Sequence, residues 1–285
     1  ARELADHVGY SIQKSSVELS RSRPLPQVES HALFMTAVSD IHRHRLSNFA
    51  NARKQLEHLI ERVPDHSVLH AWLAKWYVLE ISQGWSESPA AATRTALDCV
   101  KRALDIDPGC AISLTVEGMV HSSSRAEQSL AGKRFQEALA IDPNHALAWL
   151  MYARMHAYRG DGAQAVEYAQ RARFLSPLDP HSYFFDALSA MCHVVDGDLQ
   201  RGYDLISRSL SANPNHLSTH RAKVITLQMM GRDAEANAAA KQLLRHDPEL
   251  TVEGYIESHP AGDSSVGQDW GAALRAAGVP QRNIR

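Results

Sequence analysis

Sixteen histidines make a metal site the first chemistry to test in this 285-residue sequence. His66 and His70 are four residues apart, as are His216 and His220, and this spacing places two ligands on one helix face. Neither pair has the intervening glutamate of an HExxH zinc site, and a structural zinc ion needs four ligands. His66, His145 and His216 each follow a proline by two residues, which favours a repeat position at a helix start. We therefore expect no metal and no cofactor.

The remaining chemically active side chains are not arranged for catalysis. Cys192 is followed directly by His193, and adjacent residues on a helix do not face each other. The glycines at residues 160–162 have no lysine and no preceding strand, so they do not form a phosphate-binding loop. The serines at residues 122–124 are interpreted as a polar connector in a hairpin turn. These patterns predict a protein that is not an enzyme.

Composition excludes two classes of partner. The net charge is −2, with charged residues at 22% and mixed in sign, and the longest basic cluster, at residues 41–45, is too short for direct nucleic-acid binding. No apolar run reaches the ~18 residues of a membrane span, and no signal peptide is visible. Three cysteines without a CxxC pair are typical of a reducing compartment, so we expect a cytoplasmic location.

Prolines recur at regular intervals. Most of them close a short phrase of one apolar and one polar residue, as in Ile106-Asp107-Pro108, and the intervals between successive prolines run from 34 to 44 residues: Pro64, Pro108, Pro143, Pro177, Pro214 and Pro248. Proline lacks an N–H and clashes with the preceding helical turn, so each marks a helix end. A period near ~34 is that of the tetratricopeptide repeat (TPR), a helix–turn–helix hairpin.

Small residues follow the same period. In the unit of residues 146–177, alanines stand where two helices approach closely or pack: Ala153, Ala165, Ala169 and Ala172. Other units carry small residues in register, among them Ala74, Ala96, Gly118, Ala131, Ala190, Gly202, Ala236 and Ala240. Trp149 and Tyr152 are expected to fill the space between the helices, with Trp149 as a buried anchor.

The predicted fold is therefore an all-α, TPR-like right-handed solenoid of about six helix hairpins. Residues 1–26 form a leading helix, at residues 3–21, and a linker. Residues 27–250 form the array, and residues 251–285 a C-terminal loop and a closing helix at 268–277. An insertion of about ten residues around 82–89 is predicted to lengthen the turn of one hairpin. Because the chain begins without methionine, we expect it to be part of a larger protein.

A binding groove is the functional feature that such an array predicts. The first helices of stacked hairpins line a concave face, and their exposed positions here are mostly apolar with a few cations. The candidates are Lys75, Met119, Leu150, Arg154, Phe184, Met191 and Arg221. A groove of this kind suits an amphipathic segment. The same stripe also fits an interhelical core, and both interpretations stay open.

Trp85 is a separate candidate, because it lies in the insertion between Gly84 and Ser86, outside the repeat pattern. Either it folds back and caps the apolar end of its own hairpin, or it projects as an aromatic anchor onto a partner. Tryptophan is over-represented among interface hot spots, which supports the second interpretation.

Several phrases resemble one particular group of repeats. They are Gln83-Gly84-Trp85-Ser86, the double-proline phrase at residues 175–180 that leads to Tyr183-Phe184-Phe185, Asn213-Pro214-Asn215, and the terminal Leu274-Arg275-Ala276-Ala277-Gly278-Val279-Pro280. Residues 26–280 are similar to the C-terminal TPR region of bacterial signalling proteins. In these proteins the array follows an adenylate/guanylate cyclase domain or a winged-helix DNA-binding domain.

The resemblance implies a sensory or regulatory module that controls an attached effector domain in signal transduction or transcription. Its partner would be another protein, a peptide or a second copy of the chain. The alternative is a receptor domain that closes the concave groove around a small ligand or peptide. The resemblance brings no catalytic residues, because the effector half is not in this sequence.

Overall fold

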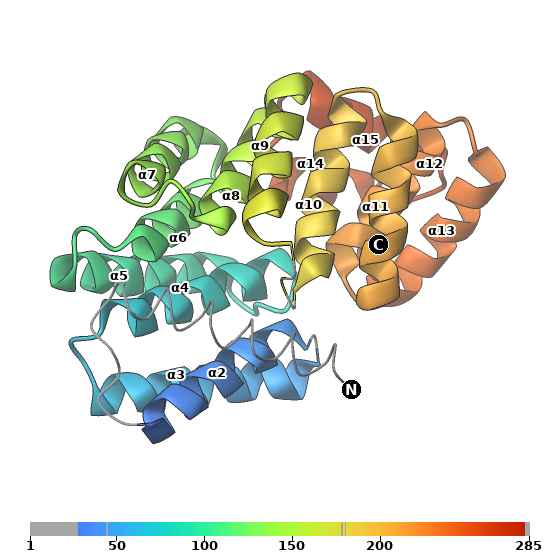
Figure 1. The fold of residues 1–285 in the computed structure, drawn as a ribbon. Helices are drawn as coiled ribbons and strands as arrows, with labels where there is room; N and C mark the ends of the chain where they lie inside the picture. The colour runs from blue at the N-terminus through green and yellow to red at the C-terminus, as the bar shows by residue number, and fades with distance from the viewer. Residues whose placement is uncertain (1–27, 44, 178, 180, 283–285) are drawn as a thin grey trace, which may run out of the picture. The chain divides into compact units, whose positions relative to one another are not determined.

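The computed structural model describes residues 28–43, 45–177, 179 and 181–282, and the predicted leading helix lies outside this part of the chain. The described residues are helical, with no strand among them, and the TPR-like all-α fold is confirmed (Figure 1). The helices that pair as six hairpins are α2 (Val28–His42) with α3 (Leu46–Arg62), α4 (Ser67–Ser82) with α5 (Pro89–Ile106), α6 (Ala111–His121) with α7 (Gln128–Ile141), α8 (Ala146–Tyr158) with α9 (Gly162–Leu175), α10 (Ser182–Val195) with α11 (Leu199–Ala212), and α12 (Leu217–Met229) with α13 (Asp233–His246). A short 3₁₀ turn, η1 (Arg125–Glu127), precedes α7, and α14 (Val252–Ser258) and α15 (Ser265–Ala276) follow the hairpins.

The chain divides into two compact units. The first contains Ala1–His121, Lys133–His145 and Ser176–His181, and the second contains Ser122–Gly132, Ala146–Leu175 and Ser182–Arg285. Helix α7 contributes residues to both.

Each repeat proline lies two residues beyond the last residue of a helix, as predicted from its missing N–H. The residue before the proline closes the helix end. Asp107 accepts a backbone hydrogen bond from Gly109 at 3.0 Å through its side chain, and Asn213 accepts one from Asn215 at 3.1 Å. These turns satisfy backbone donors between one hairpin and the next.

Glycine ends the first helix of several hairpins. Gly160 has a φ of +86°, and its N–H bonds to the Ala157 carbonyl while the Asp161 N–H bonds to the His156 carbonyl, both at 3.0 Å. This is the Schellman arrangement, which needs a left-handed residue that glycine adopts without strain. It forms the tight turn between α8 and α9.

Small residues let the hairpin helices touch. Ala153, Ala165 and Ala172 have no exposed surface, and Ala169 is 2% exposed. At Gly118 a Cβ atom would stand 2.5 Å from the ring of Phe135, which is fully buried. The predicted close approach is therefore built from residues without bulk at the contact.

Trp149 is not the buried anchor that its repeat position predicts. The side chain is half-buried, with its ring 5.1 Å from that of Tyr168, on which Tyr152 also stacks. The neighbouring Leu150 is fully buried instead. A TPR position fixes which side chains enter the hairpin but not how deeply a ring as large as indole is covered.

The insertion lengthens the helices as well as the turn. Helices α4 and α5 have 16 and 18 residues, compared with 13 and 14 in α8 and α9. Residues 83–88 connect them, and Gly84, with a φ of +72°, closes α4. The extra residues extend α4 to Ser82, and α5 begins at Pro89, because the first position of a helix tolerates proline.

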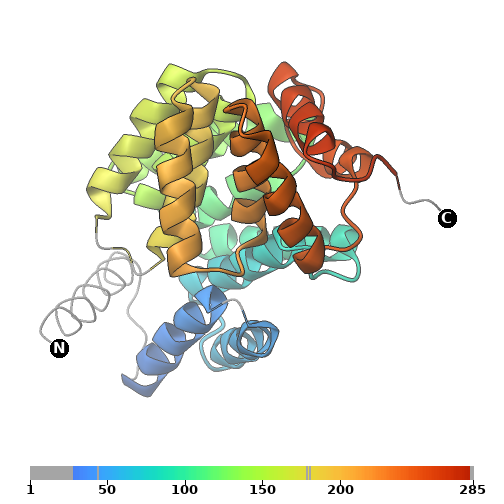
Figure 2. The ribbon, with the colours of Figure 1, turned by 90° about the vertical axis from the view of Figure 1, so that its right-hand side faces the viewer.

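The C-terminal segment contains one helix more than predicted, since α14 occupies part of the expected loop. Helix α15 packs against α14 and α12, and the pair is drawn in red in Figures 1 and 2. Its buried side chains join those of α12 and α13 in one apolar cluster, which includes Ile225, Leu243, Trp270 and Leu274.

Candidate partner-binding surfaces

Three of the predicted groove residues are buried inside the protein. Leu150 has no exposed surface, Met119 is 2% exposed and Lys75 is 5% exposed. The Lys75 ammonium lies 4.1 Å from the centroid of the Trp72 ring, a distance typical of a cation–π contact. In this structure these three side chains contribute to packing rather than to an accessible surface.

The other four predicted groove residues, Arg154, Phe184, Met191 and Arg221, are half-buried in the second unit. Arg154 donates a hydrogen bond to the Ser122 hydroxyl at 2.6 Å. Met191 packs against the apolar cluster that contains Trp270, and the charge of Arg221 acts on Tyr255 and His259. Helix α12 therefore contacts α15 directly, the charge of Arg154 on α8 reaches His259, and α10 packs against the apolar cluster that α12 and α15 share.

We call the side of α8, α10 and α12 that meets α14 and α15 the first-helix face, and its members are Arg154, Tyr158, Met191, Val195, Arg221 and Ile225. Tyr158 contacts the C-terminal pair directly, because its ring lies 5.0 Å from His259 and 6.1 Å from Trp270. Val195 packs against the same apolar cluster as Met191. Sequence spacing identified Arg154, Met191 and Arg221, and it missed Tyr158 because that residue lies one turn beyond the repeat positions considered.

Charge on the first-helix face is positive. His259 lies among the rings of Tyr158, Tyr255 and Trp270, and removal from water lowers its pKa to about 3. The charges of three arginines act in the same direction: Arg221, Arg154 and Arg125. Burial also raises the pKa of Tyr255. At neutral pH the imidazole and the phenol are therefore uncharged, and the arginines supply the field.

Arg125, in η1, binds the end of α14. Its guanidinium donates to the backbone carbonyls of Ile256, Glu257 and His259 and pairs with the Asp263 carboxylate at 2.5 Å. The last carbonyls of a helix have no intrahelical partner and carry partial negative charge, so a guanidinium stabilises them. No sequence pattern pointed to Arg125, because its partners are more than 130 residues away.

Trp85 folds back onto the neighbouring hairpin. The ring is half-buried and stands edge-on to Phe49 at 5.0 Å, and Phe49 stacks on Trp76 at 4.5 Å. The backbone N–H of Trp85 donates a hydrogen bond to the backbone carbonyl of Glu80, which closes the turn that contains Gly84. The ring therefore lies on α3 of the neighbouring hairpin, and the role of Trp85 at an interface stays a prediction.

The histidine pairs have a shared packing role. The Nε2 atoms of His70 and His220 each lie 2.7 Å from a proline carbonyl oxygen, that of Pro64 and Pro214 respectively. Burial lowers the pKa of both side chains, which favours a neutral ring that donates this bond. Among the described residues, no group of three or more histidine, cysteine, aspartate or glutamate side chains is placed to hold a metal ion.

The thiols that burial affects most are poorly suited to nucleophilic chemistry. Burial raises the pKa of Cys99 to about 11 and that of Cys192 to about 12, and both are free cysteines. A thiol is reactive as the thiolate, which these environments disfavour.

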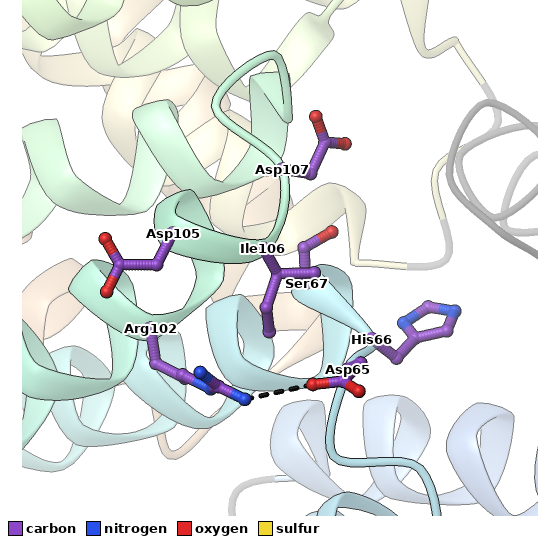
Figure 3. A pocket seen from close by; sticks show the side chains of 7 residues that line it. All are labelled: Asp65, His66, Ser67, Arg102, Asp105, Ile106 and Asp107. Carbon is purple, nitrogen blue, oxygen red and sulfur yellow. Dashed lines mark hydrogen bonds and ion pairs between the residues drawn. The ribbon is translucent and has the colours of Figure 1, made fainter.

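One hollow in the first unit, of about 510 Å³, lies at the turn between hairpins (Figure 3). Arg102 donates to Asp65 at 3.0 Å across it, while Asp105 and Asp107 point away from this pair. None of the predicted groove residues is among those that line it. Among the described helices, none is both long and apolar enough to cross a membrane.

The fold is similar to that of several solved proteins. PilW, a type IV pilus biogenesis factor, is 20% identical with a TM-score of 0.52, and the alignment covers 74% of this chain and 92% of PilW. A chain of the APC/C hetero-tetramer Cut9–Hcn1 is 14% identical with a TM-score of 0.60, covering 87% of this chain and 46% of that one. TTC0263, a TPR protein of Thermus thermophilus, is 15% identical with a TM-score of 0.52, and the alignment covers 70% of this chain and 98% of TTC0263. No protein-family model matches the sequence, and no curated protein matches it in a sequence comparison.

Proposed function

We propose that this chain is a non-catalytic interaction module that binds a protein or peptide through the first-helix face of its second unit. One observation carries the proposal: that face already holds a helical segment, the chain's own α15, through apolar contacts with Tyr158 and with the cluster on α12. Recognition of an amphipathic helix by an apolar groove is a recurring mode of peptide binding. The aromatic and arginine side chains on the face are also the residue types enriched at interface hot spots.

The proposal extends to regulation of an attached effector domain in bacterial signalling or transcription. The phrases around Trp85 and at residues 175–180 support this context, because they resemble TPR regions that follow a cyclase or a winged-helix domain. Binding on the array would then change the output of the attached domain. The partner is a separate protein, or else a second copy of the chain.

The natural full-length protein provides the test. Arg221→Glu reverses one charge on the first-helix face, and Arg171→Glu reverses an exposed charge on α9, away from it. We expect the first variant to change cyclase activity or DNA binding severalfold and the second to leave it unaltered, with both melting near the parent temperature. Equal outputs from parent and both variants would contradict the proposal.

Sedimentation of the same proteins identifies the partner class. If the partner is a second copy, the parent sediments as a dimer at raised concentration and Arg221→Glu weakens that dimer. A monomer at all concentrations indicates a different protein. The gene segment upstream should encode the effector, and a coding sequence with no cyclase or DNA-binding domain would remove the regulatory part of the proposal.

A further inference from the structure

Helix α15 meets the first-helix face with the spacing of a bound helical ligand. Its buried side chains are Trp270, Ala273 and Leu274, and Ala277 follows directly after the helix. These positions are i, i+3, i+4 and i+7, the anchor pattern of helices that bind in grooves. The aromatic residue Trp270 comes first in the sequence, and the later anchors include Ala273 and Ala277. Because these side chains are small, the helix backbone lies close to the surface that it covers.

Helix α14 is fixed at both ends by groups distant in sequence. At its start, the N–H groups of Val252 and Glu253 donate to the carbonyls of Pro280 and Gln281, at 2.9 and 3.2 Å. At its end, Arg125 binds the carbonyls. A seven-residue helix is marginal by itself, so these contacts decide whether it stays in place.

Charge is complementary across this contact. Residues 252–276 carry four carboxylates and one arginine. Asp263 pairs with Arg125, and the charges of Arg154 and Arg221 act on His259 within the segment, whereas Glu253 pairs with Arg282 beyond the end of the segment. A segment with this charge is attracted to the face irrespective of the chain to which it belongs.

The attachment is unlike that of a cap that continues a repeat array. A cap stacks on the last hairpin, whereas here Tyr158 of α8 and Arg125 of η1 also contact the C-terminal pair. Gly262 allows the clamp, because a Cβ atom there would collide with the Arg125 guanidinium and the Ile256 carbonyl oxygen. The pair is therefore attached through contacts with α8, η1 and α12 that are separate from the pairing of helices within the hairpins.

We infer that the first-helix face binds an acidic amphipathic helix of a partner, with α14–α15 as its built-in occupant and Arg125 as the latch that sets the competition between them. This rests on the proposed function and names the partner's chemistry: an aromatic residue, small residues three and seven positions later, and leucine four positions later. A tethered occupant has an effective concentration on the order of millimolar. The apparent affinity of a partner is therefore reduced in proportion to the fraction of molecules whose face is open.

Two measurements on the whole chain test the latch. Hydrogen exchange reports how often residues 252–276 open. A labelled synthetic peptide of residues 264–277 reports binding to the open face, because it carries the anchors from Trp270 to Ala277 but none of the groups that Arg125 binds. In Arg125→Ala, exchange in this segment should rise at least about tenfold, since charge-assisted hydrogen bonds are lost. The peptide's affinity should rise by the same factor, because both depend on the open fraction.

Arg171→Ala is the matched control, and it should change neither quantity. Arg125→Lys keeps the positive charge but loses the several N–H donors of the guanidinium, so it should give a smaller effect in the same direction. It replaces Arg125→Ala as the test variant if that variant does not fold. Unchanged exchange in both Arg125 variants overturns the inference, as does faster exchange in all helices alike. Local opening without peptide binding also overturns it, since the segment would then be a structural cap. That result leaves the effector assay to judge the proposed function separately.

Discussion

The hairpin of α8 and α9 and the C-terminal pair of α14 and α15 are held in place by different means. In the hairpin, alanines at the contact bring neighbouring helices together, and the partners are close in sequence. In the C-terminal pair, Arg125 and Tyr158 bind from distant elements, and charge takes part. The difference teaches that a periodic, local core can carry a non-periodic attachment whose contacts come from elements distant in sequence.

The largest effect is expected inside a hairpin. Phe135→Ala removes a fully buried ring packed on Gly118 and should lower the free energy of unfolding by about 3–5 kcal/mol, measured by urea denaturation. Phe174→Ala is the control, because this ring is 75% exposed and its loss should cost less than about 0.5 kcal/mol. Equal costs would contradict the assignment of Phe135 to the core.

A smaller effect is expected at the buried carboxylate of α10. Asp186 is 5% exposed and accepts two hydrogen bonds from Arg208, at 2.6 and 3.2 Å, with Arg173 at 3.6 Å. Asp186→Asn should lower the free energy of unfolding by roughly 1.5–3 kcal/mol, the usual contribution of hydrogen bonds to charged groups. Asp204→Asn, at an exposed carboxylate, should leave the free energy of unfolding nearly unchanged. A larger loss of stability in Asp204→Asn than in Asp186→Asn would contradict the pairing of Asp186 with Arg208.

The C-terminal pair should respond to acid. His259 has a pKa of about 3 in the folded protein and about 6.5 when released, so both states are neutral above pH 6.5 and the full stability is present there. As the pH falls from 6.5 toward 3, only the released state takes up a proton, and attachment weakens. At pH 5 the loss should be on the order of 1–2 kcal/mol.

Hydrogen exchange of residues 252–276, corrected for the intrinsic pH dependence of exchange, measures this loss. His259→Gln cannot titrate and should flatten the pH dependence of that segment. Other histidines with lowered pKa, such as His70, act on the hairpins and therefore appear in other segments. The same pH dependence in parent and variant would show that His259 is not the responsible group.

The smallest effect is expected at Trp85. Its half-buried ring contacts Phe49, and an aromatic pair contributes about 0.5–1.5 kcal/mol beyond the area it buries. Trp85→Ala should therefore lower the melting temperature slightly and leave sedimentation unaltered. An unchanged melting temperature together with weaker self-association would support the interface interpretation instead.

The sequence determined the array because its signals are local. Each proline removes a backbone donor wherever the chain places it, so the helix ends at Pro64 through Pro248 could be predicted to within a few residues. Alanine and glycine at fixed intervals likewise determined where helices touch, as at Ala153 and Gly118. The fold class follows from these features without any knowledge of distant contacts.

The tertiary structure alone decided what the first-helix face meets. Arg154, Met191 and Arg221 were predicted from their spacing as exposed groove positions, but spacing within a repeat carries no information on a segment that returns from beyond the last hairpin. The latch at Arg125, the extra helix α14 and the neutral His259 all depend on that return. An isolated arginine in a polar turn has no periodic signal, and its role exists only where folding brings the end of α14 within reach of its guanidinium.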